Sequence, residues 1–175
     1  MRIVAGRFAG RDLVSPNDFR VRPTAEPVRA ALLDQLAADL AGARILDLFA
    51  GTGALGLEAM SRGAKSADFV EFRPASLHAL KANVAALKVR DHTRIFKKDA
   101  LLFMNGAEPG AYEIAFADPP YGSTLLNRTI ATWQARKFSS VLAVEHERGH
   151  ELPGGSWRKN FDETAVTIYR GSRKA

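Results

Sequence analysis

Short apolar runs alternate with helical apolar repeats along most of the chain. The runs that predict strands are residues 45–49, 67–72, 93–96, 112–117 and 141–144. Apolar residues at helical spacing predict helices at residues 28–40, 55–62, 77–87, 101–104 and 126–133, the first of which we expect to end at Gly42. This alternation predicts an α/β fold built on a parallel, doubly wound sheet.

The two ends of the chain depart from this alternation. Residues 3–14 contain two strand-like runs around Gly6 to Gly10, which predict a small β-hairpin. The tail from Trp157, with its clearest strand at residues 165–169, predicts an antiparallel hairpin that completes a seven-stranded sheet. We therefore expect an N-terminal β-hairpin arm at residues 1–22 and a sheet domain at residues 23–175.

A glycine-rich turn follows the first predicted strand. Gly51, Gly53 and Gly56 match G-x-G-x-x-G between a strand and a helix, where backbone N–H groups can face a ligand. Asp47 lies inside the strand and would repel a pyrophosphate but attract an ammonium group. Glu71 ends the second strand, about twenty residues after the turn, where an acid can bind a ribose. These features favour S-adenosylmethionine, which has an ammonium, a sulfonium and a ribose, although a turn without a ligand is the alternative.

Acidic residues follow four predicted strands in succession. Taken singly, each could be a helix cap or a surface charge. The carboxyl ends of parallel strands meet at one edge of the sheet, where ligands bind. We therefore expect all four acids on one rim of the sheet, with Asp47 and Asp118 in a shared cleft; the four are Asp47, Glu71, Asp99 and Asp118.

The tetrapeptide Asp118-Pro119-Pro120-Tyr121 directly follows the fourth predicted strand. Its prolines fix the backbone and have no N–H donors, so the loop presents acceptors. The Asp118 carboxylate and the Pro119 carbonyl can accept both hydrogens of an exocyclic amine, and Tyr121 can stack on an extruded base. The four residues are therefore candidate catalytic residues that orient an amine for methyl transfer.

Composition and charge indicate where the protein works and what it contacts. The 175 residues include no cysteine, which excludes disulfides and thiolate metal sites. No apolar run reaches the roughly twenty residues of a membrane span, so we expect a cytoplasmic protein without membrane contact. The net charge of +6 is carried by residues 1–30 and 157–175, which predicts a polyanionic partner such as RNA. The candidate RNA contacts are Arg7, Arg11, Arg20, Arg22, Thr24 and Arg29, and Thr24 could also cap the first helix.

One motif points to a different chemistry. His146-Glu147-Arg148-Gly149-His150 matches the zinc peptidase signature H-E-x-x-H, which requires a helix to place both histidines on one face. Here the motif follows a predicted strand and leads into Pro153-Gly154-Gly155, with no obvious third ligand nearby. We therefore expect no metal site.

Over nearly its whole length, the chain resembles the RsmD family of bacterial 16S ribosomal RNA guanine-N2 methyltransferases. The resemblance rests on Arg-Ile-Val-Ala-Gly at residues 2–6, Gly10-Arg11, Arg22-Pro23-Thr24 with Val28-Arg29, the stretch 47–59 and residues 118–121. It implies a Rossmann-like class I S-adenosylmethionine-dependent methyltransferase fold. It also implies methylation of the exocyclic amine of one guanine in small-subunit ribosomal RNA.

The resemblance also implies roles for the site residues. Asp47, Gly51 and Gly53 would contact the methionine part of S-adenosylmethionine, Glu71 its ribose and Asp99 its adenine amine. Further cofactor contacts are expected at Phe49, Thr52, Phe72, Ala100 and Asp118. The chain departs from the family at Glu26-Pro27, where an acid followed by a basic residue is usual.

Other functions remain compatible with the residues alone. Asp-Pro-Pro-Tyr suits amines of adenine or cytosine in another RNA or in DNA as well as guanine. A nicotinamide dehydrogenase could use the glycine turn, and a non-catalytic RNA-binding module would explain the basic ends. We expect a monomer that acts on ribosomal RNA or the small ribosomal subunit.

Overall fold

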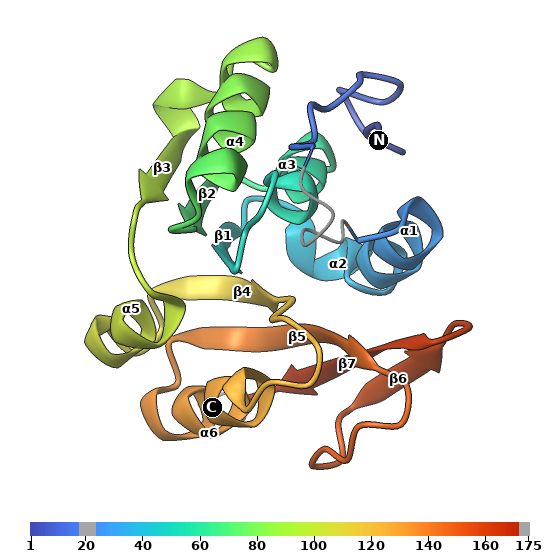
Figure 1. Cartoon of the computed structure of the whole chain (residues 1–175), viewed down its shortest axis with the longest axis vertical. Helices are drawn as coiled ribbons and strands as arrows, with labels where there is room; N and C mark the ends of the chain where they lie inside the picture. The colour runs from blue at the N-terminus through green and yellow to red at the C-terminus, as the bar shows by residue number, and fades with distance from the viewer. Residues whose placement is uncertain (18–23, 172–175) are drawn as a thin grey trace.

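A computed structural model describes residues 1–17 and 24–171 of the chain, and a single seven-stranded sheet organises it (Figure 1). The strand order is β3-β2-β1-β4-β5-β7-β6. The first five strands run parallel to one another, and β7 is antiparallel to both of its neighbours. The predicted fold class and the closing antiparallel hairpin are confirmed. The strands are β1 (Arg44–Leu48), β2 (Ser66–Val70), β3 (Thr93–Phe96), β4 (Tyr112–Ala117), β5 (Ser139–Glu147), β6 (Trp157–Asn160) and β7 (Thr164–Arg170).

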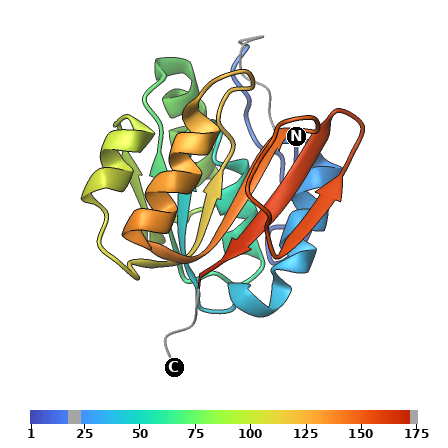
Figure 2. The same ribbon diagram turned by 90° about the horizontal axis from the view of Figure 1, so that it is seen from below.

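Helices cover both faces of the sheet, as Figure 2 shows with α5 and α6 on one side and α1 and α2 on the other. One apolar core joins the sheet to α1–α4 and the N-terminal residues, and a second joins it to α5 and α6. The helices are α1 (Glu26–Gln35), α2 (Ala37–Leu40), α3 (Ala54–Ser61), α4 (Pro74–Ala86), α5 (Ala100–Gly106) and α6 (Leu125–Arg136), with a 3₁₀ turn η1 (Arg90–His92). No helix within the described ranges is long and apolar enough to cross a membrane.

The first helix differs from its prediction in two ways. The chain turns at Leu36, so two short helices replace the single helix expected to end at Gly42. Leu36 and Leu40 are both buried, because the apolar spacing continues through the turn. Ala25 is the N-cap residue, without a side-chain cap, so the expected capping role of Thr24 is wrong.

The N-terminal residues form a minimal hairpin that packs on α3 (Figure 1). A single antiparallel bridge joins Arg2 and Asp12, and Ile3 N–H donates to the Arg11 carbonyl at 2.9 Å. Ile3 and Leu13 are buried in the core. The predicted hairpin is therefore present, with Arg7 near its tip, but it forms one bridge rather than two regular strands.

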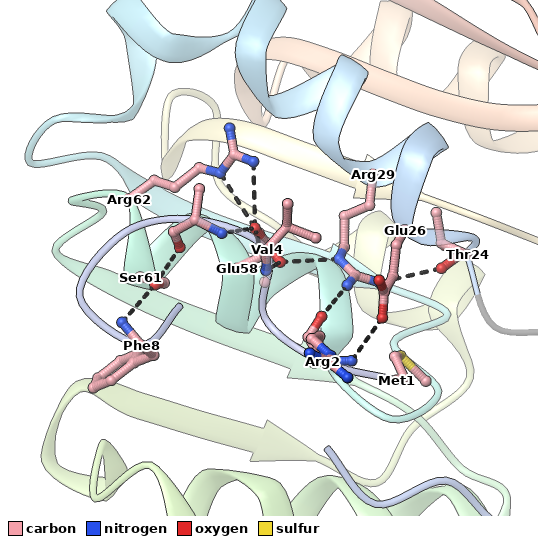
Figure 3. Close-up of polar contacts among 12 residues, drawn as sticks. Met1, Arg2, Val4, Phe8, Thr24, Glu26, Arg29, Glu58, Ser61 and Arg62 are labelled. Atoms are coloured by element: carbon pink, nitrogen blue, oxygen red, sulfur yellow. Dashed lines mark hydrogen bonds and ion pairs between the residues drawn. The ribbon is translucent and has the colours of Figure 1, made fainter. Parts of the chain in front are cut away.

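Glu58 of α3 fixes this hairpin to the body of the protein (Figure 3). The side chain is fully buried and its carboxylate accepts the backbone N–H groups of Val4 and Ala5 at 3.0 Å. It also accepts from Arg29 Nε at 3.0 Å and from Arg62 Nη2 at 3.3 Å. A buried charge is tolerated only when it is paired and hydrogen-bonded, and Glu58 meets that condition.

The same network corrects one predicted RNA contact. Arg29 is fully buried and cannot reach an external RNA. Its guanidinium donates to Glu58, to the Thr24 carbonyl at 3.2 Å and to the Arg2 carbonyl. The prediction that Arg29 binds RNA is therefore wrong, since the residue joins α1, α3 and the N-terminal hairpin (Figure 3).

The first prediction concerns Glu58→Ala, which leaves Arg29 buried without its carboxylate. We expect the free energy of unfolding to fall by about 3–5 kcal/mol. Asp34→Ala is the matched control, because Asp34 forms an ion pair with Arg62 but is 72% exposed. Its cost should stay below about 1 kcal/mol. Urea denaturation followed by circular dichroism measures both, and equal losses would contradict this account of Glu58.

Candidate active site

A cleft of about 350 Å³ opens where β1, β2, β4 and β5 end. Asp47 and Asp118 both line it, so the two sequence motifs meet in one place. Lys98, Arg73 and Glu145 also line the cleft and were not predicted from the sequence. The predicted residues that line it are Thr24, Asp47, Phe49, Gly51, Thr52, Glu71, Phe72, Ala100, Asp118, Pro119, Pro120 and Tyr121.

The three glycines of the turn have different structural roles. Gly51 lines the cleft at φ +57°, and a side chain there would meet nothing within 4 Å. A Cβ at Gly53, which has φ +81°, would lie 2.4 Å from Leu80 Cδ1. A Cβ at Gly56 would lie 2.5 Å from Phe69 Cε1. Gly51 therefore leaves room for a ligand, while Gly53 and Gly56 permit close packing behind the turn.

Glu71 ties the glycine turn to the end of β2. Its Oε2 accepts the Gly51 N–H at 2.8 Å, and its Oε1 accepts the N–H groups of Phe72 and Arg73 at 2.9 Å. Glu71 lines the cleft, and its contact with a ribose remains a prediction. The backbone bonds fix the orientation of that carboxylate before any ligand arrives.

Asp47 is a buried acid beneath the same turn. Its Oδ2 accepts the Gly56 N–H at 3.0 Å. The pKa of this carboxyl is raised to about 8: burial is the main cause, the hydrogen bond from Gly56 opposes the shift, and the nearby charge of Glu71 adds to it. A cation entering the cleft would favour the ionised form, so the site suits a ligand with a positive group.

Asp99 has a different position from the other three acids. The residue is exposed and is not part of the cleft lining. Its Oδ1 accepts the Leu102 N–H at 3.1 Å and so caps α5. Its neighbours Lys98 and Ala100 line the cleft. A contact from Asp99 to adenine remains a prediction.

The Asp-Pro-Pro-Tyr loop is held at both ends. Thr24, two residues before α1, donates from its Oγ1 to Asp118 Oδ2 at 3.2 Å, so the start of the first helix is joined to the candidate catalytic acid. The Tyr121 hydroxyl and Thr164 Oγ1 lie 2.7 Å apart, which joins the loop to β7. The first contact holds Asp118, the predicted acceptor of the amine, and the second holds Tyr121, the predicted stacking surface for the base.

Glu145 is the most important site residue that sequence reasoning missed. It is buried, belongs to β5 and lines the cleft beside Asp118. Its position directly after the apolar run 141–144 could have indicated it, because Asp118 likewise follows the apolar strand 112–117. The strand was predicted to end at residue 144, whereas β5 continues to Glu147.

Two of the predicted RNA contacts, Arg7 and Arg11, are exposed on the N-terminal hairpin, whereas Thr24 lies in the cleft. Arg7 is exposed and its guanidinium lies 4.5 Å from the centre of the Phe8 ring. Arg11 is exposed and its Nη2 donates to the Ala86 carbonyl at 3.0 Å. Thr24 lies in the cleft, and Arg20 and Arg22 lie outside the described residues.

The H-E-x-x-H motif is not helical. His146 lies in β5, where its Nε2 and Thr167 Oγ1 are 2.9 Å apart and burial lowers its pKa. His150 follows in a turn, with its Nε2 2.8 Å from Asn127 Oδ1. Across residues 1–17 and 24–171, no group of three or more acidic or histidine side chains is placed to hold a metal ion.

The second prediction concerns Asp47→Asn. In the unfolded chain the carboxyl has the ordinary aspartate pKa of 3.8, whereas in the folded protein its pKa is about 8. The wild type therefore loses stability as pH rises from about 4 to about 8, and the variant lacks this loss. We expect similar melting temperatures at pH 4 and a higher one for the variant at pH 8.

As pH rises, the wild type should bind S-adenosylhomocysteine more tightly although its folded state becomes less stable. Wild-type affinity should rise between pH 6 and 8 as Asp47 ionises, and the variant should bind at least about tenfold more weakly at pH 8. Thermal melting and calorimetric titration measure the two effects. Equal binding by both proteins would show that Asp47 does not hold the ligand's ammonium group.

Comparison with known proteins identifies relatives over nearly the whole chain. The family model described as Conserved hypothetical protein 95 matches residues 1–170. Ribosomal RNA small subunit methyltransferase D of Escherichia coli K12 is 35% identical over 174 residues, which cover 96% of this chain and 86% of the relative.

Solved structures with the same architecture support this relationship. The Escherichia coli protein yhhF superposes with a TM-score of 0.84 at 33% identity and covers 97% of both chains. The Thermus thermophilus 16S rRNA N2 G1207 methyltransferase (RsmC), solved with AdoMet and guanosine, has a TM-score of 0.67 at 20% identity, over 85% of this chain and 44% of its own, and so shares the fold. The chain therefore belongs to the RsmD family, described as Conserved hypothetical protein 95, and has the class I S-adenosylmethionine-dependent methyltransferase fold.

Proposed function

We propose that this protein transfers the methyl group of S-adenosylmethionine to the exocyclic amine of a guanine in 16S ribosomal RNA. One observation carries the proposal: Asp47, below the glycine turn, and Asp118, at the head of the Asp-Pro-Pro-Tyr loop, open into a single cleft. The first suits a cationic methyl donor and the second an amine. The small-subunit methyltransferases among the relatives support ribosomal RNA as the substrate.

The cleft contains groups that fit S-adenosylmethionine. Asp47 would hold the ammonium group and Glu71 the ribose hydroxyls, with Gly51 allowing the ligand close to the backbone. Asp99, which caps α5 outside the cleft lining, is proposed to bind the adenine amine. Gly53 would not contact the ligand itself; it lets the turn pack closely against Leu80. Phe49, Thr52, Phe72 and Ala100 would provide the remaining contacts. When bound, S-adenosylmethionine supplies a methyl group already activated by its sulfonium.

The protein's contribution to the reaction is alignment. The Asp118 carboxylate and the Pro119 carbonyl accept the two hydrogens of the amine, which directs its lone pair toward the methyl group. Alignment of this kind can supply about 7–11 kcal/mol of the barrier reduction. Asp118 or water takes the proton released on alkylation. Tyr121, fixed through Thr164, provides the face on which the base stacks.

RNA binding is proposed for the N-terminal hairpin and the segment after it. Arg7 and Arg11 are exposed on the hairpin, and Arg20 and Arg22 precede Thr24 in the sequence. We also propose that the protein acts in the cytoplasm, where ribosomal subunits are assembled. We further propose that it acts as a monomer.

The third prediction tests the separate roles of the two halves of the cleft. Asp118→Ala should reduce methyl transfer to unmodified small-subunit RNA by at least about 100-fold, because the amine loses an acceptor. S-adenosylhomocysteine binding should change by less than about threefold, below a 1 kcal/mol effect. Asp91→Ala, which removes an exposed acid from η1, is the control and should retain both properties. Loss of binding and transfer in parallel would refute this division of roles.

The fourth prediction concerns RNA binding. Arg7→Ala should weaken binding to ribosomal RNA and reduce the slope of log affinity against log salt by about 1, the effect of one lost phosphate contact. Arg136→Ala, at the end of α6, is the matched control and should leave the slope unchanged. Filter binding between 50 and 200 mM salt measures the slope. An unchanged slope for Arg7→Ala would exclude it as a phosphate contact.

A further inference from the structure

We infer that Glu145 selects guanine over other bases by accepting a hydrogen bond from N1–H of the target base. The inference rests on the proposed function and deepens it, because Asp-Pro-Pro-Tyr alone does not distinguish the amines of guanine, adenine and cytosine. Glu145 lies beside Asp118 in the cleft.

The register of the sheet places the two acids side by side. Strands β4 and β5 pair in parallel, with Ala117 opposite Val144, and the next residues along the two strands are Asp118 and Glu145. In-register residues of neighbouring parallel strands point to the same face of a sheet. Both acids line the same cleft, as this geometry requires.

Glu145 also lies close to the loop that would hold the base. It lines the main cleft with Asp118 and Pro119, and it lines a smaller recess with Pro120 and Tyr121. A base stacked on Tyr121, with its amine at Asp118 and Pro119, would therefore present its Watson–Crick edge to Glu145.

The chemistry of that edge favours guanine. Guanine carries N1–H beside the two hydrogens of its N2 amine, so it offers three adjacent donors. Asp118, the Pro119 carbonyl and Glu145 offer three acceptors in the same cleft. Adenine and cytosine each carry an amine beside a ring nitrogen with a lone pair, and that lone pair would face the Glu145 carboxylate.

Glu145 is a buried acid in the wall of the cleft. It is 7% exposed in a strand whose preceding residues are Val141, Leu142, Ala143 and Val144. A buried carboxylate requires hydrogen-bond donors around it, and N1–H of a bound guanine would be one of them. A hydrogen bond between a carboxylate and N1–H is charge-assisted, so it can discriminate strongly between bases.

The test uses a base that keeps the amine but lacks N1–H. 2-Aminopurine has an amine at C2 and an unprotonated N1. Small-subunit RNA is ligated around a synthetic oligonucleotide with guanine or 2-aminopurine at the methylated position and reconstituted into subunits. Wild type, Glu145→Gln and Glu151→Gln are compared by kcat/KM on both substrates. Glu151 is exposed and lines no part of the cleft, so its variant is the matched control.

We expect the wild type and Glu151→Gln to prefer guanine to 2-aminopurine by at least about tenfold, the value of one good base contact. Glu145→Gln should reduce this preference to below about threefold, because the amide can donate to an unprotonated N1. Its binding of S-adenosylhomocysteine and its melting temperature should remain close to wild type. A role in structure alone would lower activity on both substrates and leave the ratio unchanged.

Three other outcomes would each refute either the role of Glu145 or the proposed function. A wild-type preference close to one would refute the inference without any variant. Guanine methylation with an unchanged ratio in Glu145→Gln would refute the role of Glu145 and leave the proposed function intact. Absence of methylation at guanine in every protein would refute the proposed function itself, and this inference with it.

Discussion

Parallel pairing of β1 with β4 is the constraint on which the site depends. Asp47 pairs with Phe116 across these strands, and Phe116 pairs with Ala143 of β5. Two residues beyond Phe116 and Ala143 are Asp118 and Glu145, on the same face of the sheet. β1 and β4 are neighbours although β2 and β3 intervene in the sequence, so the strand order reverses here and opens the cleft.

Buried acids serve two purposes in this structure. Glu58 is surrounded by the arginines and N–H groups that it requires, so its charge joins the N-terminal hairpin, α1 and α3. Asp47 instead retains a pKa raised to about 8, because burial outweighs its hydrogen bond from Gly56. The first acid is fully paired within the protein and stabilises the fold. The second, Asp47, is placed so that a bound cation can pair with its carboxylate.

The two networks meet at Thr24. Arg29 donates to the Thr24 carbonyl, and the Thr24 hydroxyl donates to Asp118. Thr24, two residues before α1, is thereby held between the structural ion pair and the candidate catalytic acid.

Much of the fold and part of the site could be predicted from the sequence. Local apolar patterns gave β3 and β4 with their observed bounds, and the glycine turn and the Asp-Pro-Pro-Tyr loop meet in one cleft as predicted. The failures involve long-range contacts. Arg29 has the same local sequence features as an RNA-binding arginine, but in the fold it is buried and paired with Glu58, which lies 29 residues away in α3. Glu145 was missed because pairing with β7 extends β5 past the apolar run.

The central claim is that one cleft holds a cationic methyl donor beside an amine pocket. A crystal structure of the complex with S-adenosylhomocysteine tests it most directly. The account predicts that the amino group of the ligand lies within hydrogen-bonding distance of Asp47 and that its sulfur faces Asp118 and Pro119. A ligand bound elsewhere, or one whose sulfur faces away from the Asp-Pro-Pro-Tyr loop, would contradict the account.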